Sequence, residues 1–340
     1  MKYNLVTMWS DIAYLAAGLI LLLLGGNYLT EGAVAVARRF NVSSLMIGLT
    51  VVALGSAMPD IAVCVESALE HKTAIAVGNI IGANIFDLLL VIGLMAVVRP
   101  WKVGPMMTGQ DLPMLVLSAV CLWIVGDTRI FDGTPENVIN RSAGLMLLVI
   151  FAVYMRLTVQ SAKTMLSTGT HSGGVAESHQ AKGEKKGVGK AQIVSWLMIV
   201  GGLAALVVGG DWVVDGASGI ALKAGMSQGM VALTVVAIGN SLPDVTTSLT
   251  ATLKGQPDLA FGNIIGACII DALLAIGVSS AITPLSAGTV GFVDFMTFVG
   301  SALLVLVFPL LSRTRTMKHW QGVVLILLYI AYMIFTIIRG

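Results

Sequence analysis

Apolar residues occur along this chain in ten long runs, each separated from the next by a polar stretch. A helix needs roughly 20 apolar residues to cross the hydrocarbon core of a bilayer. The pattern therefore predicts an all-α polytopic membrane protein with ten transmembrane helices, near residues 10–37, 44–70, 74–97, 111–127, 140–158, 191–221, 228–253, 258–282, 290–311 and 319–338. The fourth run is the shortest of the ten.

Two stretches of the chain are copies of each other. Residues 48–93 align without gaps to residues 232–277 and match at 22 of 46 positions. The same offset of 184 residues places GGNYLTEGA at 25–33 against GGDWVVDGA at 209–217. Each copy belongs to a set of five predicted helices, an odd number, so the second copy enters the membrane in the opposite direction. The sequence thus predicts two inverted five-helix repeats.

A polar stretch at 159–190 separates the first repeat (1–158) from the second (191–340). Gly, Ser, Lys and His dominate this stretch and apolar residues are few, so we expect a flexible tether and not a folded domain. His171 and His179 lie in the tether without cysteine neighbours or the spacing of a metal site. The tether is therefore not predicted to bind a metal ion.

Composition agrees with a membrane protein. Hydrophobic residues make up 56% of the chain and charged residues 11%, whereas about 25% of residues are charged in typical soluble domains. The formal net charge of +2 does not suggest a nucleic-acid partner. The lipid bilayer is the partner that this composition predicts, and no obligate protein partner is evident.

Basic residues are distributed unequally between the predicted loops. If the N-terminus lies outside the cell, 14 of the 20 Lys and Arg residues fall in internal loops. The positive-inside rule therefore predicts that both termini are extracytoplasmic. Five of these 14 residues lie in the tether and a sixth, Arg156, just before it; without these six the count is 8 internal to 6 external.

Four aspartates occupy matched positions inside the apolar runs: Asp60 matches Asp244, and Asp87 matches Asp271. A carboxylate in hydrocarbon costs a few kcal/mol or more, so such residues usually mark a functional site. From a rise of about 1.5 Å per residue, we expect all four near the middle of the membrane. Oxygen ligands suit hard cations such as Ca²⁺, Mg²⁺, Na⁺ and K⁺, whereas Zn²⁺ favours Cys or His.

Proline precedes one aspartate of each repeat, at Pro59 and Pro243. Proline lacks an N–H group and clashes with the carbonyl four residues earlier. We therefore expect the second and seventh helices to break between Gly55 and Pro59 and between Gly239 and Pro243, which would free backbone carbonyls inside the membrane. The glycine-rich motifs GNIIGANIFD and GNIIGACIID predict similar local unwinding in the third and eighth helices.

These motifs resemble the two alpha repeats of the calcium/cation antiporter superfamily, in particular prokaryotic sodium/calcium exchangers, across nearly the whole chain. GSAMPD (55–60) and GNSLPD (239–244) stand where the family typically has G-T-S-x-P-E, and the motifs ending at Asp87 and Asp271 stand where it has G-N-x-x-G-S-N-I-x-N or -D. The resemblance implies a secondary antiporter in the plasma (inner) membrane of a prokaryote, not an enzyme, and no cofactor. Ca²⁺ is the expected divalent cation, and Na⁺, H⁺ or K⁺ the counter-ion.

The resemblance also implies a ligand set. The family's paired calcium-binding carboxylates fall on Asp60 and Asp244, and its second carboxylate-or-amide pair falls on Asp87 and Asp271. The same four aspartates are the expected metal ligands. Further hydroxyl, amide and backbone-carbonyl ligands fall on Ser56, Asn240, Ser241, Ala53 and Ala237, while Asn79 and Asn263 serve either as site ligands or in interhelical hydrogen bonds.

Several positions depart from the family pattern. Both signature glutamates are aspartates here, and hydroxyl ligands of the family are replaced by Ala57, Ala83 and Ala267. These changes leave Mg²⁺ transport and proton coupling open. Two other classes of protein also remain: a divalent-cation channel with the same ligands, and an intramembrane aspartyl protease, which also uses paired aspartates but has no need of an inverted repeat.

Overall fold

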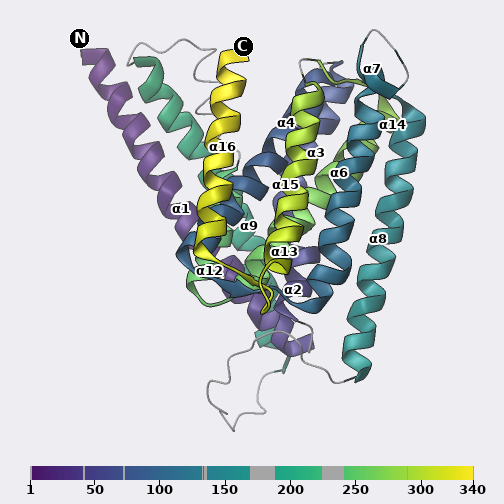
Figure 1. The fold of residues 1–340 in the computed structure, drawn as a ribbon. Helices are drawn as coiled ribbons and strands as arrows, with labels where there is room; N and C mark the ends of the chain where they lie inside the picture. Colours follow the sequence, from purple (N-terminus) through teal and green to yellow (C-terminus); the bar gives the residue numbers. More distant parts are fainter. Residues whose placement is uncertain are drawn as a thin grey trace.

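The computed structural model describes residues 2–40, 43–71, 73–131, 133, 136–168, 188–223, 241–288 and 290–339, most of them helical (Figure 1). The α-helices are α1 (Lys2–Phe40), α2 (Ser44–Ile47), α3 (Ala53–Leu69), α4 (Thr73–Phe86), α5 (Ile92–Val98), α6 (Leu112–Gly126), α7 (Thr128–Phe131), α8 (Arg141–Thr168), α9 (Val188–Lys223), α12 (Leu242–Leu253), α13 (Pro257–Ile270), α14 (Ile276–Ile282), α15 (Phe292–Leu310) and α16 (His319–Arg339). The π-helical turns are η1 (Gly48–Val52), η2 (Asp87–Val91), η3 (Met107–Asp111) and η5 (Asp271–Ala275). The strands are β1 (Trp101–Lys102), β2 (Val138–Ile139), β3 (Leu285–Ser286) and β4 (Thr316–Met317).

Nine helical stretches in the described part of the chain are long and apolar enough to cross a membrane. They correspond to nine of the ten predicted spans, and the all-α polytopic fold is confirmed. The fourth span begins at Met107, earlier than predicted, because Pro105 starts the helix and a proline is well tolerated in a first turn. The predicted seventh span, 228–253, is described only from Ser241 onward. His171 and His179 of the tether lie outside the described residues.

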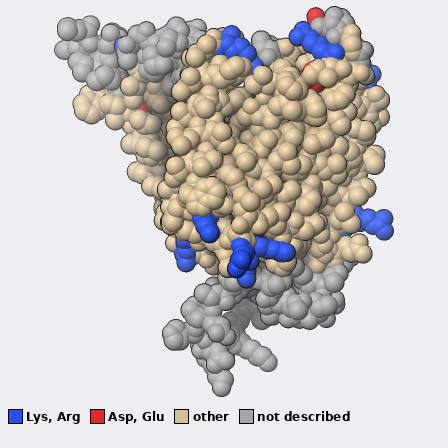
Figure 2. Space-filling model, viewed as in Figure 1, with Lys and Arg blue, Asp and Glu red and all other residues tan. Residues whose placement is uncertain are grey.

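The surface between the two ends of the molecule is apolar. Figure 2 shows Lys and Arg side chains gathered at both ends of one face, with a broad belt between them that is almost free of charge. On α8, Leu145, Val149 and Val153 form an exposed stripe, with 57%, 63% and 52% of their surface accessible. An apolar surface of this extent is unfavourable in water but matches lipid hydrocarbon. The chain is therefore an integral membrane protein.

The two repeats lie in opposite orientations. The start of α1 and the end of α16 lie at one end of the molecule, whereas α8 ends and α9 begins at the other (Figure 1). Two short antiparallel ribbons join the repeats, β1 with β4 and β2 with β3. Each ribbon pairs a strand of one repeat with a strand of the other, as a pseudo-two-fold axis in the membrane plane requires. Two-residue strands leave no periodic pattern, so the sequence did not predict them.

Glycines spaced seven residues apart hold the first helices of the two repeats together. Matched positions on α1 and α9 carry them: Gly18, Gly25 and Gly32, and Gly202, Gly209 and Gly216. A Cβ atom added at Gly202 would lie 2.7 Å from the backbone nitrogen of Leu29, and one added at Gly25 would lie 2.9 Å from the carbonyl oxygen of Gly202. The two helices can approach this closely only because these glycines have no side chain.

Candidate functional site

The second span is interrupted at a different place from the one that its proline predicts. The turn η1 separates α2 from α3, and α3 then continues through Pro59. The expected break between Gly55 and Pro59 is therefore misplaced. Proline removes only its own N–H and locks φ near its helical value, so packing against neighbouring helices can keep the chain helical around it. The corresponding residues of the seventh span, 228–240, lie outside the described part of the chain.

The third and eighth spans are interrupted at the aspartates themselves. The turn η2 begins at Asp87 and the turn η5 begins at Asp271, directly after the two glycine-rich motifs. Single π turns inside α-helices occur frequently at functional sites, because the wider turn disturbs the regular hydrogen bonding of the backbone. The prediction that these two helices are interrupted is confirmed, and the interruptions occur at matched positions of the two repeats.

Each motif asparagine binds the aspartate of the neighbouring helix. Asn79 Nδ2 donates a hydrogen bond to Asp60 Oδ1 over 2.7 Å, and the matched Asn263 Nδ2 donates to Asp244 Oδ1 over 3.4 Å. Ser56 Oγ, from the first repeat, donates to Asn263 Oδ1 of the second over 3.1 Å. The sequence allowed both asparagines to be either site ligands or members of interhelical hydrogen bonds, and the structure shows the hydrogen bonds. They also orient the two carboxylates and connect the repeats at the site.

Four carboxylates from the two repeats lie close together. All six pairs among Asp60, Asp87, Asp244 and Asp271 are within electrostatic range of each other. Asp87, Asp244 and Asp271 are buried, and Asp60 is partly exposed. Like charges repel strongly where the dielectric constant is low. Positive charge is therefore needed to balance this arrangement, and a bound cation would supply it.

Unpaired polar atoms accompany these carboxylates. Asp87 Oδ1 and Asp271 Oδ1 are buried without a hydrogen-bond partner among the described residues, and so are both amide atoms of Asn84. The hydroxyls of Thr247 and Ser248, on α12, are also buried without a hydrogen-bond partner among the described residues. Buried polar atoms are normally paired, so each such atom calls for a partner that the described residues do not supply. An oxygen-binding cation and its water molecules would satisfy the carboxylate and hydroxyl oxygens.

Matching the two repeats could not reveal the polar residues among these. The counterpart of Asn84 in the second repeat is Cys268, and the counterpart of Ser248 in the first is Cys64. A search for identical polar residues in both copies passes over them. The available signal was a polar residue in an otherwise apolar run, as at Asn84 within GANIFD.

The remaining predicted ligands are only partly described. Ser241 is buried directly before α12, and the carbonyl oxygen of Ala53 lies 3.3 Å from Ser56 Oγ. Ala237 and Asn240 lie outside the described residues. Within the described part of the chain, no three His, Cys, Asp or Glu side chains converge closely enough to hold a metal ion. The assignment of the metal ligands therefore stays a prediction.

Comparison with known proteins identifies the family. The family model described as sodium/calcium exchanger protein matches residues 10–160 and 194–338. The chain belongs to the sodium/calcium exchanger family. It is thus a cation antiporter of the exchanger type and not an enzyme, and this family transports Ca²⁺ and Na⁺ as substrates without a cofactor.

Relatives of this exchanger match it over nearly its whole length. The inner membrane protein YrbG of Escherichia coli is 32% identical, over 92% of this chain and 91% of its own. The sodium/calcium exchanger MaX1 of Methanosarcina acetivorans is 26% identical, over 94% of this chain and 96% of its own. The structure of the sodium-calcium exchanger NCX_Mj soaked with 10 mM Na⁺ and zero Ca²⁺ is 29% identical and superimposes with a TM-score of 0.79, covering 96% of this chain and 98% of that one. The inverted-repeat fold is consistent with that structure.

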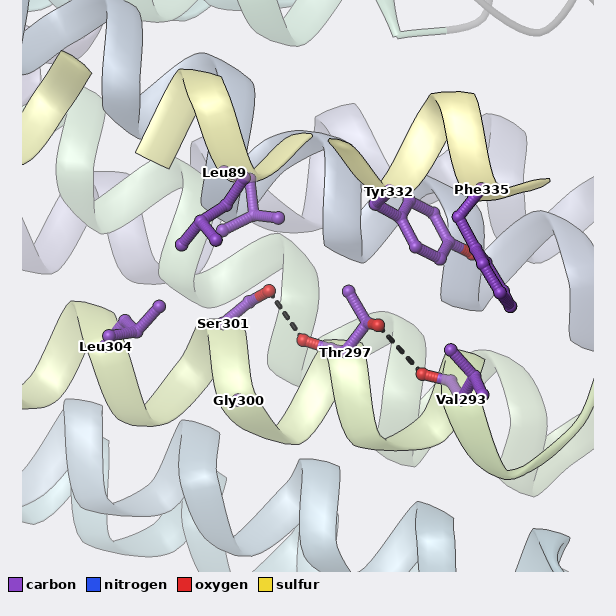
Figure 3. Close-up of a pocket in the computed structure, with 9 residues that line it drawn as sticks. Leu89, Val293, Thr297, Gly300, Ser301, Leu304, Tyr332 and Phe335 are labelled. Carbon is purple, nitrogen blue, oxygen red and sulfur yellow. Dashed lines mark hydrogen bonds between the residues drawn. The ribbon is translucent and has the colours of Figure 1, made fainter. Parts of the chain in front are cut away.

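A groove of about 300 Å³ between α15 and α16 is distinct from the aspartates of this exchanger (Figure 3). Its lining is mainly apolar and includes Leu89 and Phe335. The hydroxyls of Ser301 and Thr297 point along α15, where they donate to the carbonyls of Thr297 and Val293 over 2.6 Å and 2.8 Å. Because these hydroxyls are already engaged with the helix, the groove lacks the oxygen-rich character of a cation site.

Proposed function

We propose that this exchanger is a secondary active antiporter that moves Ca²⁺ against Na⁺ by alternating access. The shared binding site is the four-aspartate cluster, defined as Asp60, Asp87, Asp244 and Asp271. The observation that carries the proposal is that these four carboxylates, from two inverted repeats, all lie within electrostatic range of one another. The membrane is the inner membrane of a prokaryote, with both chain termini outside.

The chemistry of the cluster favours a hard cation. Carboxylate, amide and hydroxyl oxygens dominate the polar atoms of the site, and such ligands suit Ca²⁺ and Na⁺. Two sulfur atoms are near, at Cys64 and Cys268, but the Cys64 thiol is engaged with the carbonyl oxygen of Ala76 at 3.6 Å. A site for Zn²⁺ or Cu⁺ would instead be built from thiolates or imidazoles.

A shared site explains how two ion flows are coupled. A calcium ion offsets two negative charges and a sodium ion offsets one, so both species can balance the same carboxylates but cannot occupy them together. Exchange then depends on the different affinity of each ion for the two access states. Ala57 and Ala267 are buried where the resemblance placed sodium-binding hydroxyls. Sodium coupling in this chain therefore depends more heavily on the aspartates.

The helices α1 and α9 are the moving part in this proposal. They pack on each other through backbone contacts at their glycines, which favours movement as one unit. At the end of the molecule where α8 terminates, Lys254 Nζ binds Glu31 Oε1 of α1 over 2.9 Å. The matched residues in the other half are Glu70 and Asp215, which are both acidic. The ion pair therefore holds α1 against the end of α12 at one end of the molecule. The equivalent residues at the other end are both negatively charged and cannot form such a pair.

Calcium flux into proteoliposomes tests the proposal. Vesicles loaded with Na⁺ should take up radioactive Ca²⁺ when diluted into a sodium-free medium. The double variant Asp60→Asn/Asp244→Asn should lower this uptake by at least about 100-fold, because residues that bind the ion directly matter at least as much as the residues that orient them. The control Asp258→Asn changes an aspartate in the first turn of α13, the helix that leads into η5, and should keep uptake close to that of the unmodified chain.

The same vesicles distinguish antiport from a channel and identify the ions that are exchanged. Uptake that persists in the double variant would overturn the site assignment, provided that the variant elutes as a monodisperse protein. Uptake that needs no exchangeable ion on the far side would indicate a channel. Parallel measurements with Mg²⁺ and Mn²⁺, and with a pH or K⁺ gradient in place of the Na⁺ gradient, identify the transported pair. Stronger exchange of Mg²⁺, or exchange driven only by protons, would contradict calcium/sodium antiport.

A further inference from the structure

The last two spans of the first repeat correspond to those of the second. DLPMLVLSA (111–119) of η3 and α6 aligns with DFMTFVGSA (294–302) of α15, and YMRLT (154–158) of α8 aligns with YMIFT (332–336) of α16. The packing agrees with this alignment, since a Cβ atom added at Gly144 of α8 would lie 2.9 Å from the carbonyl oxygen of Gly277, and one added at the matched Gly322 of α16 would lie 2.5 Å from that of Gly93. Asp111 therefore corresponds to Asp294, and Tyr154 corresponds to Tyr332.

In the second repeat, the carboxylate of Asp294 is fully paired. Arg339 Nη1 lies 2.8 Å from Asp294 Oδ2 and supplies the opposite charge. Tyr332 donates its hydroxyl to Asp294 Oδ1 over 3.0 Å, and the backbone N–H of Gly291 donates to Oδ2 over 2.9 Å. A buried carboxylate with a guanidinium partner and two further hydrogen bonds is the arrangement that burial of a charge requires.

In the first repeat, the matched carboxylate has lost all three of these partners. Asp111 is completely buried, and neither of its oxygens has a hydrogen-bond partner among the described residues. Ser161 stands where the second repeat has Arg339, and it donates to Gln110 Oε1 over 2.7 Å. The hydroxyl of Tyr154 is also buried; the Thr158 side chain is beside it, and Asp111 lies within electrostatic range.

The different helix starts explain the loss of the backbone partner. Asp294 is the third residue of α15, where a carboxylate can accept from the N–H group just before the helix. In the first repeat the helix already starts at Pro105, so Asp111 lies at the end of η3 inside a continuous helix. The backbone groups around it are engaged in helical bonding and cannot cap its side chain.

We propose that Asp111 and Tyr154 form a second cation site, separate from the four-aspartate cluster, that binds a monovalent cation such as Na⁺. The cation takes the role that the guanidinium of Arg339 has in the second repeat. A single carboxylate is balanced by one positive charge, whereas a divalent ion would leave an excess charge in a poor dielectric. The carboxylate and phenol oxygens are hard ligands of the kind that alkali cations favour.

The place of this site suggests its role. Asp111 lies directly before α6, and α6 begins toward the end of the molecule at which α8 terminates, since α7, which follows α6, lies at the opposite end (Figure 1). The site is thus near one membrane surface, and it does not contain any residue of the four-aspartate cluster. A cation bound there stabilises the packing of η3 on α8 in response to the sodium concentration on that side. This inference does not depend on the proposed transport reaction.

Thermal unfolding of the purified protein tests the second site. The parent is Asp60→Asn/Asp244→Asn, so that sodium binding at the four-aspartate cluster is weakened. Replacing choline chloride by NaCl at constant ionic strength should raise its melting temperature by about 2–4 °C at saturation. Adding Asp111→Asn should abolish this rise. Adding Ser161→Arg should also abolish it, with a melting temperature in choline close to that of the sodium-saturated parent, because the arginine supplies the charge.

A matched control and three outcomes decide the test. Gln160→Arg adds the same charge one position earlier, on an exposed part of α8, and should leave the sodium response intact. The proposal is overturned if the parent shows no sodium response, or if the response survives both Asp111→Asn and Ser161→Arg. It is also overturned if the melting temperature follows pH but not Na⁺, since a proton would then balance Asp111. If Asp111→Asn does not fold, Ser161→Arg decides alone.

Discussion

Replacing Gly202 by alanine tests whether α1 and α9 are in contact through their backbones. The added Cβ atom would lie 2.7 Å from the backbone nitrogen of Leu29 and 2.9 Å from the carbonyl oxygen of Gly25. Both atoms belong to the backbone of α1, so no side-chain rotation can relieve the contact. The helix must move away by about 0.8 Å to restore an ordinary distance of about 3.5 Å. The neighbouring Gly201 is exposed, and a Cβ there meets no atom within 4 Å.

The two substitutions should differ in their effect on the free energy of unfolding, because only one of them creates a steric clash. Alanine has a higher helix propensity than glycine by about 1 kcal/mol, and both variants gain this amount. Overpacking at a close contact costs about 1–3 kcal/mol, and only Gly202→Ala incurs that cost. Gly201→Ala should therefore be neutral or stabilising. Gly202→Ala should be less stable than Gly201→Ala by about 1–3 kcal/mol, which lowers the melting temperature by about 2–6 °C.

The assay compares the two variants under one condition. Each protein is purified in the same detergent, and the loss of the monodisperse peak in size-exclusion chromatography is followed after heating. Gly209→Ala provides a second test on the same helix, because its Cβ would lie 2.9 Å from the backbone nitrogen of Leu22. Equal melting temperatures for Gly201→Ala and Gly202→Ala would refute the inference that the glycines set the distance between the helices.

Three further substitutions have expected outcomes. Arg339→Met leaves Asp294 buried without its counter-charge. Because the Arg339 side chain is 34% exposed, the loss in free energy of unfolding should be about 2 kcal/mol, below the range for fully buried pairs. Adding Asp294→Asn should recover most of this loss, as measured by thermal unfolding. His71→Gly should stabilise the protein by about 1 kcal/mol, because a left-handed residue with φ of 59° favours glycine; a lower melting temperature would contradict this reasoning. Glu31→Gln should change the free energy of unfolding by less than about 1 kcal/mol, since its ion pair with Lys254 is exposed, and a larger loss in denaturant titration would count against it.

Strong, local physical constraints made much of the fold predictable. The spans follow from hydrocarbon thickness, and the opposite orientation of the repeats follows from an odd number of spans in each. The aspartates could be found because a carboxylate in an apolar run is costly and rarely accidental. Pro59 shows where a local rule fails, because the tendency of proline to break a helix competes with the packing around it. The two ribbons and the exposed state of each residue depend on contacts between distant segments.

The amino-acid order alone determined that this chain crosses the membrane in two inverted halves and that paired acidic residues lie within it, because hydrophobic length and periodicity act residue by residue. Only the tertiary structure decided which acidic residues have partners. Asp111 and Asp294 occupy equivalent positions in the two repeats, yet within the described residues the first has no partner and the second is bound by Arg339, 45 residues further along the chain. Whether a buried charge is balanced depends on which side chains meet it in space, and that is settled only when the helices pack.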